Sequence, residues 1–225
     1  MIIYTLLLKD EKFSEKEIFL LNFLSEMRRE KVLRFVYDMD KKLSLYSALM
    51  ARMVISGQSG ILPHDLMFGL QKNGKPYLLN EKGIHFNLSH TRNAIIGGFA
   101  REEIGVDVEK IDVPDASILP VCFHESETER FYHTREADRS SLFYKIWTRK
   151  EAYIKFTGQG LCEDITKIDT FEPKLERNFM SWSEAGYIFS VYSEEEEKQI
   201  EKVKLETGEI VDWYRNQSLH PSQRE

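Results

Sequence analysis

The chain has 225 residues, 42% hydrophobic and 30% charged, which is typical of a globular protein and excludes collagen-like, low-complexity and mostly disordered chains. Its net charge of -6 argues against nucleic acid as a partner, because a protein that follows phosphates needs a basic surface. No apolar run reaches the ~20 residues of a membrane span and no export signal is recognisable, so we expect a cytoplasmic protein with no membrane partner.

The first part of the chain combines helical patterns with short strands. Ser14 and Glu17 form a capping-box pattern, and apolar residues recur at helical spacing from about residue 40 to 55. Short apolar runs separated by turn residues then predict a meandering sheet. Its strands are expected at 66–71, 84–88, 94–100 and 104–108, with an Asn73-Gly74 turn after the first.

The second part repeats this order. Ser126 and Glu129 suggest another capping box, a long helix is predicted from about 140 to 156, and strands are predicted at 165–171, 187–192 and 200–205. The order of helices, strands, helices and strands predicts two α/β halves, residues 1–103 and 104–225. We expect a disordered tail from about residue 216.

Two carboxylates, Asp107 and Glu109, lie two residues apart in a predicted strand and therefore share one face. They repel each other unless a cation lies between them, and Mg²⁺ prefers such oxygen ligands. The alternative is an ordinary strand with one solvated face.

The long helix carries Trp147, Glu151 and Lys155 on one stripe, with Lys150 beside it. This face could provide a third metal ligand and two lysines for phosphate groups. A solvated helix flank with a Glu-Lys pair explains the same pattern.

Three weaker signals accompany these motifs. Ser89 and His90 follow a predicted strand and could face a phosphate, although a histidine at a strand end is usually structural. The Asn73-Gly74-Lys75-Pro76 segment is foremost a hairpin turn. The basic residues between Arg28 and Lys42 are adequately explained by a solvated helix.

The order and spacing of four motifs resemble those of the 4'-phosphopantetheinyl transferases, in particular the long, surfactin-synthetase-activating bacterial type. The motifs are Gly74-Lys75-Pro76, Phe86-Asn-Leu-Ser-His90, Ile104-Gly-Val-Asp-Val-Glu109 and Trp147-x-x-Lys-Glu-x-x-x-Lys155. The resemblance extends from about Glu26 to Leu161. It implies an α+β pseudo-dimer of two similar halves, monomeric, with coenzyme A and Mg²⁺ bound in the cleft between them.

The resemblance also implies roles for individual residues. The expected metal ligands are Asp107, Glu109 and Glu151. The expected coenzyme A contacts are Arg28, Lys31, Gly74, Lys75, Pro76, Ser89, His90, Lys150 and Lys155. Glu151 is the expected base for the attacking serine of an apo acyl, peptidyl or polyketide carrier protein, and Glu127 is the reserve candidate.

One position departs from the family pattern. The family usually has an arginine for the 3'-phosphate three residues after the position of Asp40, and this chain has Leu43 there. Either Lys41 or Lys42 substitutes, or selectivity for the 3'-phosphate is weaker.

The segment from Val113 to Phe123 is apolar and bracketed by two prolines. In the resembling family this region meets the carrier protein, so we expect Ile118 and Leu119 to contact that partner. The alternative is that both are core residues. A coenzyme A-binding protein without transfer activity, and a purely structural domain, also remain open as functions.

Overall fold

The structure is a computed structural model that describes residues 1–158, 164–195 and 199–219. Its architecture is α+β, which confirms the predicted class. The strands are β1 (Ile2–Leu7), β2 (Phe68–Leu70), β3 (Pro76–Leu78), β4 (His85–Thr91), β5 (Ala94–Ala100), β6 (Gly105–Lys110), β7 (Phe179–Glu184), β8 (Tyr187–Tyr192) and β9 (Glu201–Leu205). The α-helices are α1 (Glu15–Leu20), α2 (Glu26–Leu33), α3 (Asp38–Ser59), α4 (Leu119–Cys122), α5 (Glu125–His133), α6 (Glu136–Thr157), α7 (Pro173–Glu176) and α8 (Thr207–Leu219). Short 3-10 helices lie at η1 (Leu21–Phe23), η2 (Ala116–Ile118) and η4 (Ile165–Lys167).

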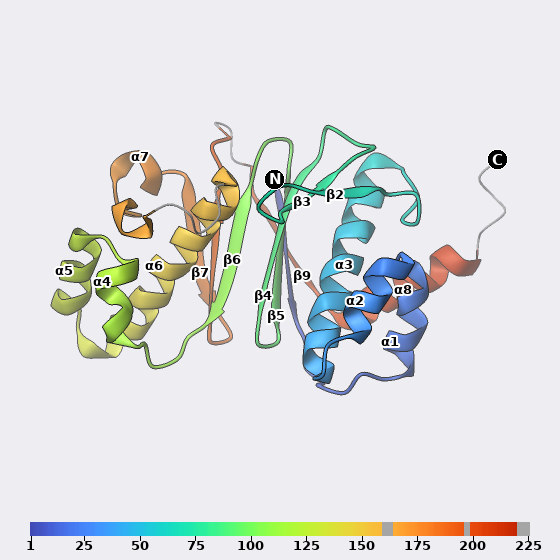
Figure 1. The fold of residues 1–225 in the computed structure, drawn as a ribbon, viewed down its shortest axis with the longest axis horizontal. Helices are drawn as coiled ribbons and strands as arrows, with labels where there is room; N and C mark the ends of the chain where they lie inside the picture. The colour runs from blue at the N-terminus through green and yellow to red at the C-terminus, as the bar shows by residue number, and fades with distance from the viewer. Residues whose placement is uncertain (159–163, 196–198, 220–225) are drawn as a thin grey trace.

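Two sheets lie at the centre of the molecule, with helices on both outer sides (Figure 1). One has the order β4-β5-β1-β9 and the other the order β6-β8-β7, while β2 and β3 form a separate ribbon. Alternate apolar residues of β5 and β6, such as Ile96 and Val106, form one core with Phe189 of β8 between the sheets. The predicted single meander is therefore wrong, because β6 leaves the sheet of β4 and β5 and begins the second one.

The two sheets are built by the same succession of elements. In each, a strand is followed by a 22-residue helix, α3 or α6, and then by an antiparallel hairpin, β4-β5 or β7-β8. The first strand pairs antiparallel with the second strand of that hairpin in both cases. In both β4-β5-β1 and β6-β8-β7, the central strand is therefore the one of the three that comes last in the sequence.

The final strand and helix return to the first half. β9 pairs in parallel with β1, and Tyr214 of α8 is fully buried against α3, where its hydroxyl donates to Leu49 O (2.9 Å). This differs from the predicted boundary, which assigned all residues from 104 to 225 to the second half. The expected disordered tail is helical through Leu219, and its remainder lies outside the described residues.

The segment expected as a strand at 165–171 contains the 3-10 helix η4, and β7 was not predicted. Among the described residues, no helix combines the length and apolar character needed to cross a membrane.

Candidate active site

The site lies where β4 of the first half runs beside β6 of the second. The two strands belong to different sheets and are joined by three alternate side chains of β4. These contacts are Val106 N donating to Asn87 Oδ1 (2.9 Å), Ser89 Oγ donating to Asp107 Oδ1 (2.7 Å), and Thr91 Oγ1 donating to Glu109 Oε2 (2.9 Å). One face of β4 thus positions both predicted carboxylates of β6.

Helix α6 packs unusually close to β6. A Cβ atom at Gly105 would lie 1.9 Å from Ala152 O, so only glycine permits this approach. Ala152 lies between Glu151 and Lys155 on α6, and Gly105 lies two residues before Asp107 on β6. The close packing of Ala152 on Gly105 therefore brings the side chains of Glu151 and Lys155 near Asp107. The sequence prediction that strand and helix share one site is consistent with this geometry.

Lys155 joins the helix to both strands. Its ammonium donates to Asp107 Oδ1 (2.6 Å) and to Ser89 Oγ (2.9 Å). It lies beside a buried carboxylate, while its own side chain remains 28% exposed. A cation that is held at a cleft and still reaches solvent can contact an anionic ligand.

The carboxylates beside Lys155 are only partly neutralised. Burial, together with the negative charge of Asp107, raises the pKa of Glu151, and Lys155 opposes this shift. Burial and the charges of Asp107 and Glu151 also raise the pKa of Glu109, against the hydrogen bond from Thr91. Three acids around one ammonium group leave an excess of negative charge.

The donor chemistry of this cluster fits a hard divalent cation. Asp107 Oδ2 is buried and has no hydrogen-bond partner, which is costly unless a ligand uses it. Within the described residues no group of three or more Asp, Glu, His or Cys side chains is already assembled around a metal position. Asp107, Glu109 and Glu151 thus fit such an ion by their oxygen donors and their negative charge, and in this structure Lys155 contacts Asp107.

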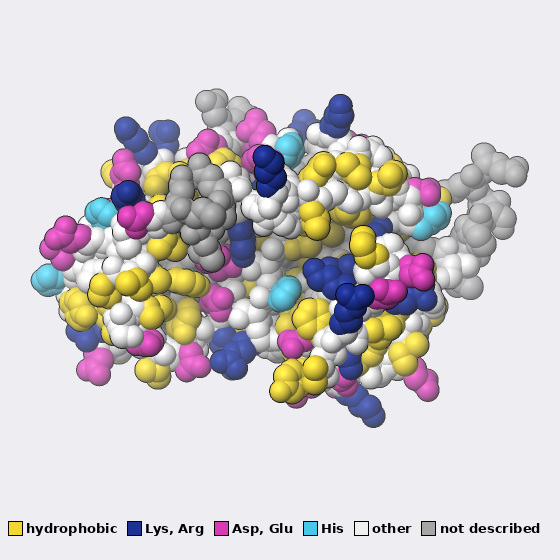
Figure 2. Space-filling model, viewed as in Figure 1, with side chains coloured by type: hydrophobic (Ala, Val, Ile, Leu, Met, Phe, Trp, Pro, Cys, Tyr) yellow, Lys and Arg dark blue, Asp and Glu magenta, His cyan; other side chains and the backbone are white. Residues whose placement is uncertain are grey.

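The opposite wall of the cleft is cationic. Figure 2 shows the molecule hollowed between its halves, with Lys and Arg side chains gathered on the wall that contains α2. Arg28 is half-buried there, its guanidinium donates to Ser44 O (2.9 Å), and its Nε is buried without a partner. Lys31 and His90 are exposed. Partial desolvation and the positive charges of Lys155 and Arg28 lower the pKa of His90.

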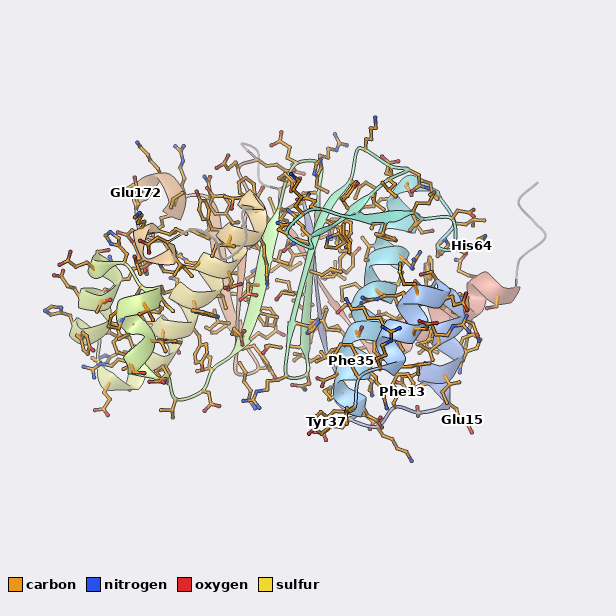
Figure 3. The ribbon with its side chains drawn as sticks, in the orientation of Figure 1. Phe13, Glu15, Phe35, Tyr37, His64 and Glu172 are labelled. Carbon is orange, nitrogen blue, oxygen red and sulfur yellow. The ribbon has the colours of Figure 1, made fainter. Side chains whose placement is uncertain are left out.

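The residues around Leu43 answer part of the question raised by the missing arginine. Leu43 of α3 is buried in the hydrophobic core of the first half. Lys42 is also fully buried, and its ammonium donates to Asp10 O and Lys12 O. Lys41 is paired with Asp38 (2.9 Å) near Phe13, beside the α2–α3 turn that exposes Phe35 and Tyr37 (Figure 3). Lys42 therefore does not replace the arginine.

The predicted Asn73-Gly74 turn joins β2 to β3, and Gly74 has the positive φ of 85° that such a turn requires. Lys75 follows it and is buried, with its ammonium 2.6 Å from Glu103 Oε2. Pro76 begins β3. Burial alone would raise the pKa of Glu103, but the hydrogen bond and the charge of Lys75 outweigh it, so the pKa is lowered. Sequence reasoning missed Glu103, since it belongs to no motif.

Lys150 and Glu127 do not lie in the cleft. Both are fully buried and form an ion pair of 2.8 Å. Lys150 also donates to Ile165 O and Ile168 O, while Glu127 accepts hydrogen bonds from His124 N and from the backbone and hydroxyl of Thr170. These contacts occupy the ammonium and both carboxylate oxygens, so the expected phosphate contact and reserve base are not supported by their positions.

The apolar segment before α5 is divided between core and surface. Leu119 is fully buried and Ile118 packs against the same core, which corrects the expectation that both face a partner. Val113 and Val121 are instead 87% and 66% exposed. Val113 precedes η2, and the turn of α4 directs Val121 outward while Leu119 of the same helix faces the core.

Sequence reasoning also overlooked Thr91. It directly follows Ser89 and His90, but no role was assigned to it, although residues 87, 89 and 91 alternate as polar side chains along β4. That alternation is the signal that predicts one polar strand face.

Comparisons with known proteins agree with the motif pattern. Residues 103–208 match the 4'-phosphopantetheinyl transferase superfamily, and residues 12–98 match the family described as 4'-phosphopantetheinyl transferase, N-terminal. The 4'-phosphopantetheinyl transferase ffp of Bacillus subtilis is 32% identical over 159 residues, which cover 71% of this chain and 70% of that protein. Sfp of Bacillus subtilis strain 168 is 31% identical over 164 residues, covering 73% and 71%. The L-aminoadipate-semialdehyde dehydrogenase-phosphopantetheinyl transferase of Mus musculus is 26% identical over 156 residues, covering 63% and 50%.

Proposed function

Because this chain belongs to the 4'-phosphopantetheinyl transferase family, we propose that it transfers the 4'-phosphopantetheine arm of coenzyme A to a serine of an apo carrier protein. The serine oxygen forms a bond to the β-phosphorus of coenzyme A, and the bond from that phosphorus to the bridging oxygen breaks. Adenosine 3',5'-bisphosphate leaves with that oxygen. The observation that carries this proposal is the cluster of Asp107, Glu109, Glu151 and Lys155 opposite a cationic wall.

The acids would hold Mg²⁺ beside the pyrophosphate of coenzyme A. We assign Asp107, Glu109 and Glu151 as its ligands, since Asp107 Oδ2 is buried without a partner and the other two have pKa values raised by burial and by neighbouring negative charge. When bound, Mg²⁺ would neutralise charge on the phosphoryl oxygens.

Cations of both halves would bind the phosphates. Lys155 lies on the acidic side of the cleft and contacts Ser89, so it can turn toward an anion that enters beside Asp107. His90 would contact the pyrophosphate from β4, and Arg28 and Lys31 would face the 3'-phosphate. The Gly74–Pro76 turn would line the adenine side. Preorganised charge of this kind stabilises phosphoryl transfer.

Glu151 is the proposed base for the serine proton. Its carboxylate belongs to the acid cluster beside Asp107 and Lys155, where a serine that enters the cleft could transfer its proton to it. Glu127 is no longer a candidate here, because its oxygens are occupied inside the second half.

We further propose that the two halves are structural repeats that form the cleft as a pseudo-dimer. Their matching order of strand, 22-residue helix and hairpin supports this. Since both walls of the site come from one chain, a cytoplasmic monomer would suffice for activity. The exposed Val113 and Val121 lie on the second half and offer apolar contacts for the carrier protein.

Mass spectrometry of a carrier protein tests this function. Apo carrier protein incubated with coenzyme A, Mg²⁺ and the enzyme should gain the mass of one phosphopantetheine arm, and omission of Mg²⁺ should prevent the gain. Binding of coenzyme A with no mass gain on any of several acyl, peptidyl and polyketide carriers would show a binding protein instead.

A further inference from the structure

Thr91 lies at the last position of β4, and its side chain crosses to the other half of the molecule. It is the third of the alternate residues that join β4 to β6, and its hydroxyl donates to Glu109 Oε2 at 2.9 Å. Asn87 contacts backbone and Ser89 contacts Asp107, so Thr91 is the residue of this row that meets Glu109.

Glu109 needs such a contact to adopt one orientation. It is half-buried near the end of β6, two positions after Asp107 on the same face of the strand. A glutamate has three side-chain torsions, and fixing them costs conformational entropy. A hydrogen bond already present in the free protein lowers that cost when a ligand binds. Threonine suits this role because its branched side chain is stiff about χ1 in a strand.

The position of Thr91 is itself fixed by both halves. The next residue, Arg92, has a positive φ of 52° in the tight β4-β5 turn. Asn93 follows, and its side chain donates to Leu8 O (2.7 Å) and accepts a hydrogen bond from the Tyr187 hydroxyl of β8. Tyr187 lies opposite Lys110 in the second sheet, one position from Glu109. The turn that holds Thr91 is therefore attached to the sheet that holds Glu109.

From this geometry we infer that Thr91 is a positioning residue that presents Glu109 for the divalent cation from the opposite half of the chain. The inference rests on the proposed function, because it assigns Glu109 to the metal. It adds that the metal ligands of the second half are oriented by the first half, so metal affinity depends on the junction between them.

The test compares Thr91→Val with Thr91→Ser. Valine keeps the branched shape and removes the hydroxyl, while serine keeps the hydroxyl. Thr5→Val is the matched control, since Thr5 lies buried in β1 of the same sheet and its hydroxyl has no hydrogen-bond partner among the described residues. Mg²⁺ binding to each coenzyme A-free protein is measured by calorimetry, with Mn²⁺ paramagnetic resonance as a second probe and melting temperature as the measure of folding.

Thr91→Val should weaken Mg²⁺ and Mn²⁺ binding at least fivefold, and Thr91→Ser and Thr5→Val should remain within twofold of the parent. In turnover, Thr91→Val should raise the KM for Mg²⁺ and recover most of kcat at saturating Mg²⁺. Unchanged metal affinity in Thr91→Val would overturn the inference while leaving the transferase proposal intact. An equal loss of metal affinity in Thr5→Val would also overturn it. So would a loss of metal affinity in Thr91→Ser together with a large drop in its melting temperature. A parent protein that binds neither metal would overturn the metal assignment and the inference together.

Discussion

Among the described residues, each half of the molecule has a fully buried Glu-Lys pair, and the incompletely paired acids of the cleft lie beside the pair of the second half. In the first half, Glu17 at the start of α1 lies 3.6 Å from Lys42 of α3. In the second, Glu127 at the start of α5 lies 2.8 Å from Lys150 of α6. In both pairs the glutamate belongs to a capping box and the lysine also donates to two backbone carbonyls.

The difference lies in what surrounds the pairs. Glu17 accepts further hydrogen bonds from Ser14 and Tyr46, so its carboxylate is fully paired within the core of the first half. Beside Lys150, Glu151 faces Asp107 and has a raised pKa. Saturated charges hold the helices in place, whereas the charges left over in the cleft remain available for a ligand. The following predictions separate these two uses of charge.

The largest expected effect comes from breaking the second pair. Lys150→Met leaves Glu127 buried without its cation and should reduce the free energy of unfolding by about 3 to 5 kcal/mol. The double variant Glu127→Leu/Lys150→Met should recover most of this loss. Urea denaturation measures both. Lys42→Met should cost less, because Glu17 keeps a second cation, Lys16 at 3.7 Å, whereas Glu127 has no ion-pair partner besides Lys150 among the described residues. Normal stability of Lys150→Met with loss of coenzyme A binding would restore the phosphate role to Lys150.

Removing a charge from the cleft should reduce activity strongly and stability only slightly. Asp107→Ala should reduce transfer at least a hundredfold, about 2.7 kcal/mol. It should change the melting temperature much less than Lys150→Met, because it relieves repulsion among the acids and the Lys155 ammonium that loses its partner still reaches solvent. Asp112→Ala, an exposed acid beyond the end of β6, is the control. Turnover within a few-fold of the parent would exclude Asp107 as an essential ligand, and an unfolded variant would show a structural role.

The first pair should make stability depend on acid. Burial alone would raise the pKa of Glu17. Hydrogen bonds from Ser14 and Tyr46 and the charge of Lys42 outweigh it, so the pKa is lowered. A carboxyl whose pKa is lowered on folding stabilises the protein above its ordinary pKa of about 4.3, and this contribution is lost as the pH falls through the folded value. Glu17→Gln should lower stability at neutral pH by about 2 kcal/mol and flatten the acid dependence. Urea denaturation across this pH range would contradict the assignment if both proteins lost stability in parallel.

The smallest effect concerns the partner surface. Val121→Asp should raise the KM for the carrier protein several-fold, about 1 kcal/mol, without changing coenzyme A affinity or melting temperature. Leu119→Asp should instead unfold the second half, because Leu119 is core. Steady-state kinetics with varied carrier concentration distinguishes the two. An unchanged KM in Val121→Asp would place the carrier elsewhere.

Local sequence patterns predicted most elements because their physical causes are local. The capping box of Ser14 and Glu17, the Asn73-Gly74 turn and the long helix before Gly158 each depend on a few adjacent residues. The second capping box was misplaced: Ser126 and Glu129 suggested it, but His124 and Glu127 form it. Glu127 therefore has a structural role in the capping box, whereas the family resemblance had suggested it as a reserve base.

Spacing could not distinguish Lys150 from Lys155. Both are lysines of one helix near Glu151, and only the packing of the loop that contains Ile165 and Ile168 shows that Lys150 is enclosed. Thr91 was missed for a related reason. Its partner Glu109 is distant in sequence, and no turn or helix rule relates two strands of different sheets.

The pairing of β1 with β9 also governs the order in which the chain can fold during synthesis. β1 leaves the ribosome well before its neighbour β9 and the α8 helix that covers α3, because both are made about 200 residues later. The second sheet requires only residues 105–192, so it can form before the first sheet acquires its outer strand. A nascent chain stopped before residue 200 would therefore expose the edge of β1 and the apolar face of α3, which makes this intermediate the one most in need of protection from aggregation.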